Sequence, residues 1–296
     1  MTWKSIKCLG LILLFLLLIL LGRQQWSRRL EKGEVLDYQQ RIKGFTAGEI
    51  LEIEIQSNDE SGLVIKKTNN GWRLNDKAAD QQKIQDLLES LLAPDRVELV
   101  AKTDLKHEDF GISEDSALKV ILKQKDNLVF LIGQSQFQGS YLRFQGQPEV
   151  FLLPRVSSAI VSGEINDWYD KTVIDLAEKK PQLIKFVGSQ SFEIDFKDEV
   201  WRLADGREVA SEKVENLIAS LSPLVATSLA NEETGKDFPA KPSQTLTISQ
   251  DQEFISLVFY QGETEFLIRK EPGGEGFLVP VWQGESLIKQ KEDFLK

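Results

Sequence analysis

GWRLNDKAADQQKIQDLLESLL, at residues 71–92, is the stretch that decides the predicted fold, because it recurs as VWRLADGREVASEKVENLIASLS at residues 200–222. In both stretches an alternating strand runs into an Asp-containing turn. A segment with apolar residues at i, i+3, i+4 and i+7 then follows, which predicts an amphipathic helix with one buried stripe. The residues that define the match are Trp72 and Leu74 in the first stretch, and Trp201 and Leu203 in the second.

The similarity continues downstream in the same order. Asp109-Phe110 corresponds to Asp237-Phe238, and the sequence FLLP at residues 151–154 corresponds to FLVP at residues 277–280. Offsets that drift by only a few residues over such a length predict an internal duplication. The further residues that define the repeat are Phe110 and Pro154 in the first copy, and Phe238 and Pro280 in the second.

Around these motifs, short alternating segments are separated by brief polar turns, which predicts antiparallel strands. One main helix packed on such a sheet makes each copy an α+β unit. The predicted fold class is therefore α+β, with two tandem repeats that follow a single transmembrane helix. The predicted parts are an N-terminal anchor at 1–26, a polar stalk at 27–47, a first repeat at 48–163, a joining segment at 164–182 and a second repeat at 183–296. Trp168 in the joining segment is expected to lie between the two copies.

The anchor is predicted from an apolar run that contains one charged residue, Lys7. From Trp3 to Trp26, two aromatic residues placed as at membrane interfaces, a helix would measure roughly 36 Å, enough to cross a bilayer. No small-residue cleavage site follows the run, and Cys8 lies in the wrong place for a lipoprotein signal. The predicted anchor residues are Trp3, Ile6, Leu9, Leu14, Phe15, Leu21 and Trp26.

The orientation of the anchor leaves two alternatives. A count of basic residues on the two sides slightly favours a cytoplasmic body. An apolar segment at the extreme N-terminus is the usual layout of an exported, tethered domain, and we therefore expect the body on the extracytoplasmic side. The single cysteine, Cys8, excludes an intramolecular disulfide.

The net negative charge of the chain bears on whether it could bind nucleic acid. The chain has a formal net charge of −10, and residues 33–296 alone hold 30 basic and 45 acidic side chains, a net charge of −15. A body this acidic repels phosphate backbones, so we expect no binding to nucleic acid.

Motifs for catalysis or cofactor binding are missing from the sequence. His107 is the only histidine, which excludes metal sites that need two histidines. The stretch from Gly133 to Phe137 lacks the final glycine of a nucleophile elbow. The glycine-rich loop at 271–276 lacks the lysine of a phosphate-binding loop. The sequence therefore predicts no catalytic residue, no metal and no cofactor.

The chain resembles the bacterial family known as domain of unknown function 4340. The resemblance rests on the Gly-Trp-Arg-Leu motif and its helix, on Asp109 to Ile112, on Ile132-Gly133 and on the hairpin from Tyr141 to Pro154. It covers most of residues 48–296. The second copy departs from the pattern, because Pro239 stands in place of Gly111 and no glycine is expected to match Gly133. Similar proteins are membrane-tethered, and many are encoded beside ABC-type transporter or gliding-motility components. The resemblance thus implies an accessory role at the bacterial inner membrane and no reaction.

Three hypotheses of function follow. The first is a non-catalytic binding module that serves an envelope or ABC-type transport complex. The second is an envelope hydrolase that uses carboxylates in a cleft between the repeats, because two carboxylates suffice for some hydrolyses. The third is a passive structural spacer. Convergent carboxylates with perturbed pKa values would favour the second hypothesis, whereas a groove of apolar and scattered polar groups would argue against it.

Overall fold

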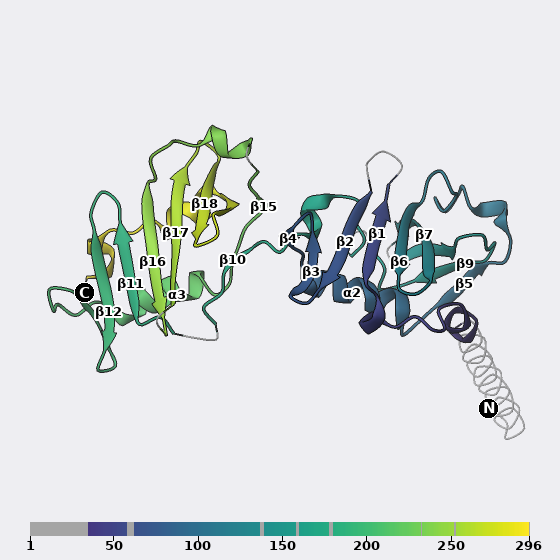
Figure 1. Cartoon of the computed structure of the whole chain (residues 1–296), viewed down its shortest axis with the longest axis horizontal. Coiled ribbons are helices and arrows are strands. Elements are labelled where there is room, and N and C mark those ends of the chain that lie inside the picture. The colour runs from purple at the N-terminus through teal and green to yellow at the C-terminus, as the bar shows by residue number, and fades with distance from the viewer. Residues whose placement is uncertain are drawn as a thin grey trace, which may run out of the picture. The chain divides into compact units, whose positions relative to one another are not determined.

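The computed structural model divides into two compact units, Met1–Tyr169 and Asp170–Lys296, and each is described by itself (Figure 1). The boundary falls inside the segment predicted to join the repeats. The structure describes residues 35–57, 62–136, 139–157, 160–177, 180–231, 233–251 and 253–295.

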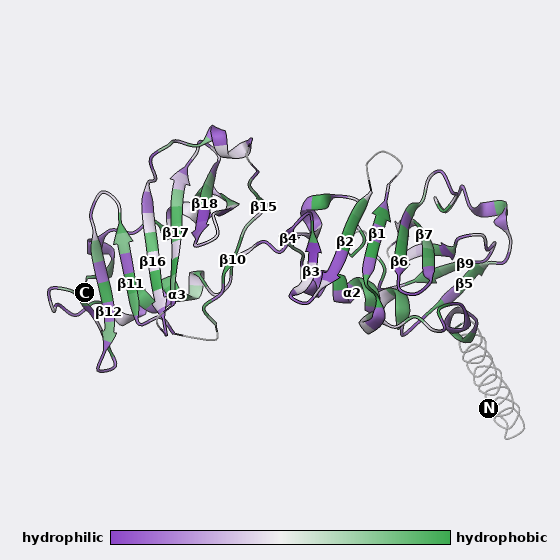
Figure 2. Ribbon diagram, in the orientation of Figure 1, coloured by the Kyte–Doolittle hydropathy of each residue, from purple (hydrophilic) through white to green (hydrophobic). Residues whose placement is uncertain are grey.

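The first unit is built on a nine-stranded sheet with the order β4-β3-β2-β1-β6-β7-β8-β9-β5, in which each neighbouring pair is antiparallel. Hydrophobic residues concentrate on the strands, and the connecting loops are largely hydrophilic (Figure 2). The strands are β1 Glu52–Gln56, β2 Leu63–Thr68, β3 Gly71–Leu74, β4 Lys77–Ala78, β5 Glu98–Ala101, β6 Leu118–Lys123, β7 Asn127–Gln136, β8 Gly139–Phe144 and β9 Val150–Leu153. Short 3₁₀ helices lie at η1 Ala47–Glu49, η2 Asp104–Lys106 and η3 Ile165–Trp168.

The inner face of this sheet is covered by α2 (Gln81–Leu92). Asp80 caps the helix by accepting a hydrogen bond from the backbone N–H of Lys83 at 2.9 Å. The segment after Asp80 is helical because its apolar residues repeat at helical spacing and so lie on one face. Burying each of these side chains against the sheet stabilises the fold by ~1.5–3 kcal/mol. The buried stripe consists of Ile84, Leu87, Leu88 and Leu91.

The side chain of Gln81 joins the first turn of α2 to β3. Its Oε1 accepts from the backbone N–H of Trp72 at 2.9 Å, and its Nε2 donates to the Trp72 carbonyl at 3.1 Å. Gly71 precedes Trp72 with a φ of +97°, and a Cβ there would lie 2.8 Å from Gln81 Oε1. The glycine of the Gly-Trp-Arg-Leu motif is therefore needed for its positive φ and for the close approach of Gln81. The tryptophan side chain of the motif lies in the core.

Residues 35–41 form a helix that covers a further part of the same inner face. Tyr38 is fully buried there, and its hydroxyl donates to the carbonyl of Leu91 at 2.9 Å. Its ring packs against Phe144 and Phe151 at centroid distances of 5.2 and 5.4 Å. Residues 35–47, which the sequence places in a polar stalk, thus belong to the first unit.

The second unit holds an eight-stranded sheet with the order β13-β12-β11-β16-β17-β18-β19-β15. Starting from β3 in the first sheet, every strand has a counterpart at the same place in this order. The strands are β11 Leu183–Val187, β12 Phe192–Lys197, β13 Val200–Leu203, β15 Ser228–Leu229, β16 Gln244–Gln250, β17 Glu253–Gln261, β18 Glu265–Glu271 and β19 Glu275–Pro280. A separate pair consists of β10 Thr172–Ile174 and β14 Leu224–Val225, and the helices are α3 Ser211–Ser220, α4 Val281–Leu287, η4 Thr234–Asp237 and η5 Lys291–Phe294.

The end of the chain completes the core of the second unit. α3 buries Val214, Leu217 and Ile218, the counterparts of the α2 stripe. Beyond α4, Phe294 is 1% exposed and its ring lies 5.6 Å from that of Phe186. The Phe294 carbonyl also accepts from the backbone N–H of residue 210 just before α3, at 2.8 Å, which fixes this last segment beside the helix.

The α+β class predicted from the sequence is wrong. In the part of the chain that the structure describes, 41% of the residues are in strands and 22% are helical, so the fold is mostly β. The sheets are larger than expected because very short strands such as β4, β5 and β15 extend them. Strands of two to four residues are too short to show an alternating pattern in the sequence.

The predicted single transmembrane helix is not seen in the structure. Among the described residues, no helix is both long and apolar enough to cross a membrane. Residues 1–26, on which the anchor was predicted with Trp3, Ile6, Leu9, Leu14, Phe15, Leu21 and Trp26, lie outside the described residues.

Trp168 does not lie between the two copies as expected. It is fully buried in the hydrophobic core of the first unit, and its indole Nε1 donates to the carbonyl of Ser162 at 2.9 Å. Its own carbonyl accepts from the backbone N–H of Asp80 at 2.8 Å, directly before α2. The tryptophan therefore stabilises the start of the main helix of its own unit.

Replacing Tyr38 tests the contribution of the 35–41 helix. Tyr38→Phe leaves the buried Leu91 carbonyl, one of the unpaired carbonyls at the end of α2, without its donor. We expect the free energy of unfolding of the first unit to fall by about 1–2 kcal/mol. Hydrogen–deuterium exchange in increasing urea measures this for peptides of each unit separately.

Tyr260→Phe in β17 is the matched control, because within the described residues the Tyr260 hydroxyl makes no hydrogen bond and its ring is half-buried. Peptides of the second unit should keep their protection in both variants. If Tyr38→Phe and Tyr260→Phe lowered the free energy of unfolding of the first unit equally, the role given to Tyr38 would be contradicted.

Candidate functional site

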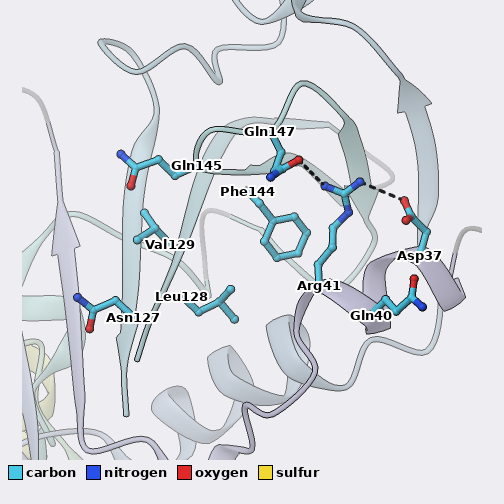
Figure 3. A pocket seen from close by; sticks show the side chains of 9 residues that line it. All are labelled: Asp37, Gln40, Arg41, Asn127, Leu128, Val129, Phe144, Gln145 and Gln147. Carbon is cyan, nitrogen blue, oxygen red and sulfur yellow. Dashed lines mark hydrogen bonds and ion pairs between the residues drawn. The ribbon is translucent and has the colours of Figure 1, made fainter. Parts of the chain in front are cut away.

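A cavity of about 670 Å³ lies in the first unit, between the 35–41 helix and the strands β7 and β8 (Figure 3). Its size is within the range of small-ligand sites, ~300–1,000 Å³. We call it the Arg41 pocket, after the side chain that reaches across it. The lining residues are Asp37, Gln40, Arg41, Asn127, Leu128, Val129, Phe144, Gln145 and Gln147.

Two turns bring the distant parts of this lining together. The β6–β7 hairpin turns between Lys123 and Asn127, so that Asn127 stands at its exposed end. After β8 the chain turns again at Gly146, which has a φ of +74°, and the backbone N–H of Gln147 donates to the carbonyl of Phe144 at 3.1 Å. Glycine adopts this left-handed conformation without steric cost. The polar side chains flanking each turn therefore face the same cavity.

Arg41 is held by two carboxylates and one carboxamide. Its Nη2 lies 3.4 Å from Asp37 Oδ2 and 3.2 Å from Glu149 Oε1, and its Nη1 donates to Gln147 Oε1 at 3.3 Å. Figure 3 shows the guanidinium between Asp37 and Gln147, beside the ring of Phe144. The guanidinium carbon is 5.8 Å from that ring's centroid, which adds a cation–π contact.

The positive charge of Arg41 is already paired with carboxylates of the same unit. Burial alone would raise the pKa of Glu149, but the Glu149 backbone N–H and Arg41 stabilise the carboxylate, and the net effect is a pKa below its ordinary value of 4.5. One guanidinium faces two carboxylates, Asp37 and Glu149, so these three groups together carry a net charge of −1.

The apolar floor of the pocket is rigidly packed. Phe144 is 5% exposed, and its ring contacts Tyr38 and Phe130 at 5.2 Å each and Phe151 at 6.0 Å. Leu128, which is also buried, lies beside it. Such a floor can accept an aliphatic group, but the Phe144 ring has no open face for stacking.

The arrangement provides no catalytic pair. Asp37 is the only carboxylate among the nine residues of the lining, and it is engaged by Arg41. Over the described parts of the chain, no group of His, Cys, Asp and Glu residues could hold a metal ion. His107 lies outside the lining and donates through Nε2 to the carbonyl of Pro148 at 2.9 Å. The pocket can thus bind through hydrogen bonds and apolar contact, without a recognisable acid–base couple.

The repeat-defining residues lie elsewhere and serve packing. Trp72 and Leu74 on β3, like Trp201 and Leu203 on β13, are buried in the inner cores of their units. Pro154 directly follows β9, and Pro280 is the last residue of β19. Phe110 is half-buried in the loop before β6, where its ring lies 4.2 Å from that of Tyr141. None of these residues lines the Arg41 pocket.

A glycine lies close to the phenylalanine of an Asp-Phe pair in each unit. A Cβ on Gly133 would lie 2.1 Å from the carbonyl oxygen of Phe110, and a Cβ on Gly262 would lie 2.8 Å from the ring of Phe238. Each glycine thus lets the phenylalanine of an Asp-Phe pair approach the sheet closely.

Sequence reasoning missed the pocket residues. One signal was present in the apolar residues Val35, Tyr38 and Ile42, whose helical spacing marks residues 35–42 as a packed helix rather than a free stalk. The carboxamides at 40, 127, 145 and 147 carried no signal, because isolated polar residues in turns are common on any surface.

Removing the Glu149 charge tests the electrostatics of the site. We expect Glu149→Gln to lower the free energy of unfolding by about 1 kcal/mol at pH 7, because Arg41 loses a partly buried partner. A lowered pKa in the folded state adds stability above pH 4.5, and this contribution disappears as the pH falls through the folded pKa. The difference between wild type and variant should therefore shrink as the pH is lowered below 4.5.

Urea unfolding of both proteins at a series of pH values measures this difference. Glu98→Gln, at an exposed position on β5, is the matched control and should leave the pH dependence unchanged. A Glu149→Gln effect that stays constant down to pH 2 would exclude the ion pair as its cause.

Comparison with known proteins places the chain in a family. The model of the family described as Domain of unknown function (DUF4340) matches residues 72–244 in one stretch, which begins in β3 and ends at the first residue of β16. The match therefore runs through parts of both units. No curated protein matches the chain, and no solved structure matches it. Since the matched stretch is more than half of the 296 residues, the chain belongs to the DUF4340 family.

Proposed function

We propose that this protein is a non-catalytic binding module that serves a protein complex of the bacterial cell envelope. The observation that carries the proposal is the Arg41 pocket, a large cavity lined by four carboxamides, an arginine paired with carboxylates, and an apolar floor. An active site that depends on acid–base catalysis places titratable groups against the substrate. Here the single lining carboxylate, Asp37, is paired with Arg41, which favours binding over the hydrolase hypothesis.

The location we propose rests on the sequence. The apolar run from Ile6 to Leu21 would tether the body to the inner membrane, with the body on the extracytoplasmic side. A partner embedded in the same membrane, such as a subunit of an ABC-type transporter, would then stay within reach of the tethered body. The net charge of −15 over residues 33–296 supports a protein partner rather than nucleic acid.

We also infer that the two units are tandem copies of one ancestral unit. The support is the matching strand order of the two sheets and the paired contacts of Gly133 with Phe110 and of Gly262 with Phe238. The spacer hypothesis does not explain the pocket of the first unit. An experimental structure with different strand orders in the two units would contradict the duplication.

The tether is tested by truncation. The full-length chain should sediment with membranes and resist extraction by carbonate, whereas a chain that lacks residues 1–26 should be recovered in the supernatant. Apolar burial in the bilayer is the physical reason, because a run of this length transfers favourably into lipid. Release of the full-length chain by carbonate would contradict the tether.

The partner is tested by affinity purification of the full-length protein in a mild detergent, followed by mass spectrometry. We expect integral envelope proteins to be enriched relative to the chain without residues 1–26 that carries the same tag. Recovery of the protein alone, with no partner above this control, would favour a spacer or an enzyme and would contradict a binding module.

A further inference from the structure

The charge balance of the Arg41 pocket selects against anions. Arg41 is the only cation of the lining, and it already faces Asp37 at 3.4 Å and Glu149 at 3.2 Å. A phosphate, sulfate or carboxylate that approached Arg41 would have to compete with these two carboxylates and would be repelled by them. An uncharged or basic ligand meets no such barrier, and the acidic body around the site attracts a basic one.

The hydrogen-bonding groups of the pocket match those of a peptide backbone. A carboxamide offers N–H donors and a carbonyl acceptor, the same two functions that each peptide unit carries. Gln40 and Asn127 make no side-chain hydrogen bond to any described residue. Both are exposed, Gln40 on the 35–41 helix and Asn127 at the start of β7, and both line the cavity. They can therefore bind an extended chain without giving up an existing partner.

The floor favours a polypeptide over a glycan. Sugar rings commonly rest on an open aromatic face, and the Phe144 ring is closed in by Tyr38, Phe130 and Phe151. Leu128 and Val129 offer aliphatic surface instead. An aliphatic side chain of a bound segment would find its contact there, while its backbone meets the carboxamides.

The place of the pocket along the chain limits where the ligand can lie. Asp37 follows Trp26 by only 11 residues, which span at most about 38 Å when fully extended. This step rests on the function proposed above, in which residues 1–26 lie in the membrane. We propose that the Arg41 pocket binds an extended segment of an integral membrane protein, close to the membrane surface and without net negative charge.

Site-specific photo-cross-linking of the full-length protein in its native membrane tests this. The photoreactive residue p-benzoylphenylalanine is placed at Asn127, the exposed first residue of β7. The matched control carries it at Glu253, the exposed first residue of β17 in the second unit. We expect an adduct from Asn127, and none from Glu253, with one integral membrane protein. Mass spectrometry should place the cross-link beside a membrane-spanning segment of that protein, in a stretch without an excess of Asp and Glu.

A charge series in the 35–41 helix tests the chemistry of the ligand. With the photoreactive residue at 127, Gln40→Lys should lower the adduct yield for a basic segment by at least about fivefold, the effect of one added unit charge ~4 Å away in bulk water. Gln40→Glu should keep or raise the yield. Gln39→Lys adds the same charge to the neighbouring exposed position outside the lining, and should leave the yield unchanged.

An unchanged yield with both variants fits an uncharged segment, whereas the following outcomes overturn the inference. A higher yield with Gln40→Lys and a lower one with Gln40→Glu would show an anionic ligand. The same adduct from 127 and 253, or adducts only with lipid or with a second copy of this chain, would show that the pocket does not hold the partner. If a partner still co-purifies in those cases, the binding function survives and only the site is wrong. If none co-purifies, the binding function fails as well.

Discussion

Each sheet in this protein has a broad apolar inner face, and the need to cover that face shapes the rest of the structure. Nine strands spaced ~4.8 Å apart are nearly 40 Å wide, whereas one helix with its side chains covers only ~10 Å. α2, with 12 residues, and α3, with 10, therefore cannot shield their sheets alone. In the first unit the 35–41 helix and the residue after it supply further cover through Tyr38 and Ile42, and in the second unit the C-terminal segment does so through Phe294.

The Arg41 pocket follows from this way of closing the core. A covering segment must present apolar residues to the sheet and polar residues to water, and the change from one to the other falls within one helical turn, between Tyr38 and Arg41. The Arg41 guanidinium connects the 35–41 helix to the segment after β8, because it pairs with Asp37 on its own helix and with Glu149 beyond β8. Arg41 and Asp37, the two charged residues of the cavity lining, are therefore engaged with each other.

The motifs that identify the family have structural explanations. Gly71 makes room for the clamp between Gln81 and β3, and Trp72 fills the core beneath it. Gly133 allows the Asp-Phe loop to lie directly on the outer face of the sheet. These residues specify a scaffold, and the side chains that could contact a ligand lie in turns and on the helical residues 35–41. A scaffold of this kind can keep its family motifs while its binding surface varies.

Periodicity in the sequence was sufficient for the longer strands, the two main helices, the antiparallel pairing and the self-similarity of the two halves, because such patterns are local and repeat every two or 3.6 residues. It did not reveal that the fold is mostly β, since β4, β5 and β15 become strands only by pairing with a neighbour. Tertiary structure alone brought residues 37–41, 127–129 and 144–147 around one cavity. The reason is physical: burial leaves a periodic trace of apolar residues in the sequence, whereas a polar cavity is created by contacts between distant segments and leaves no such trace.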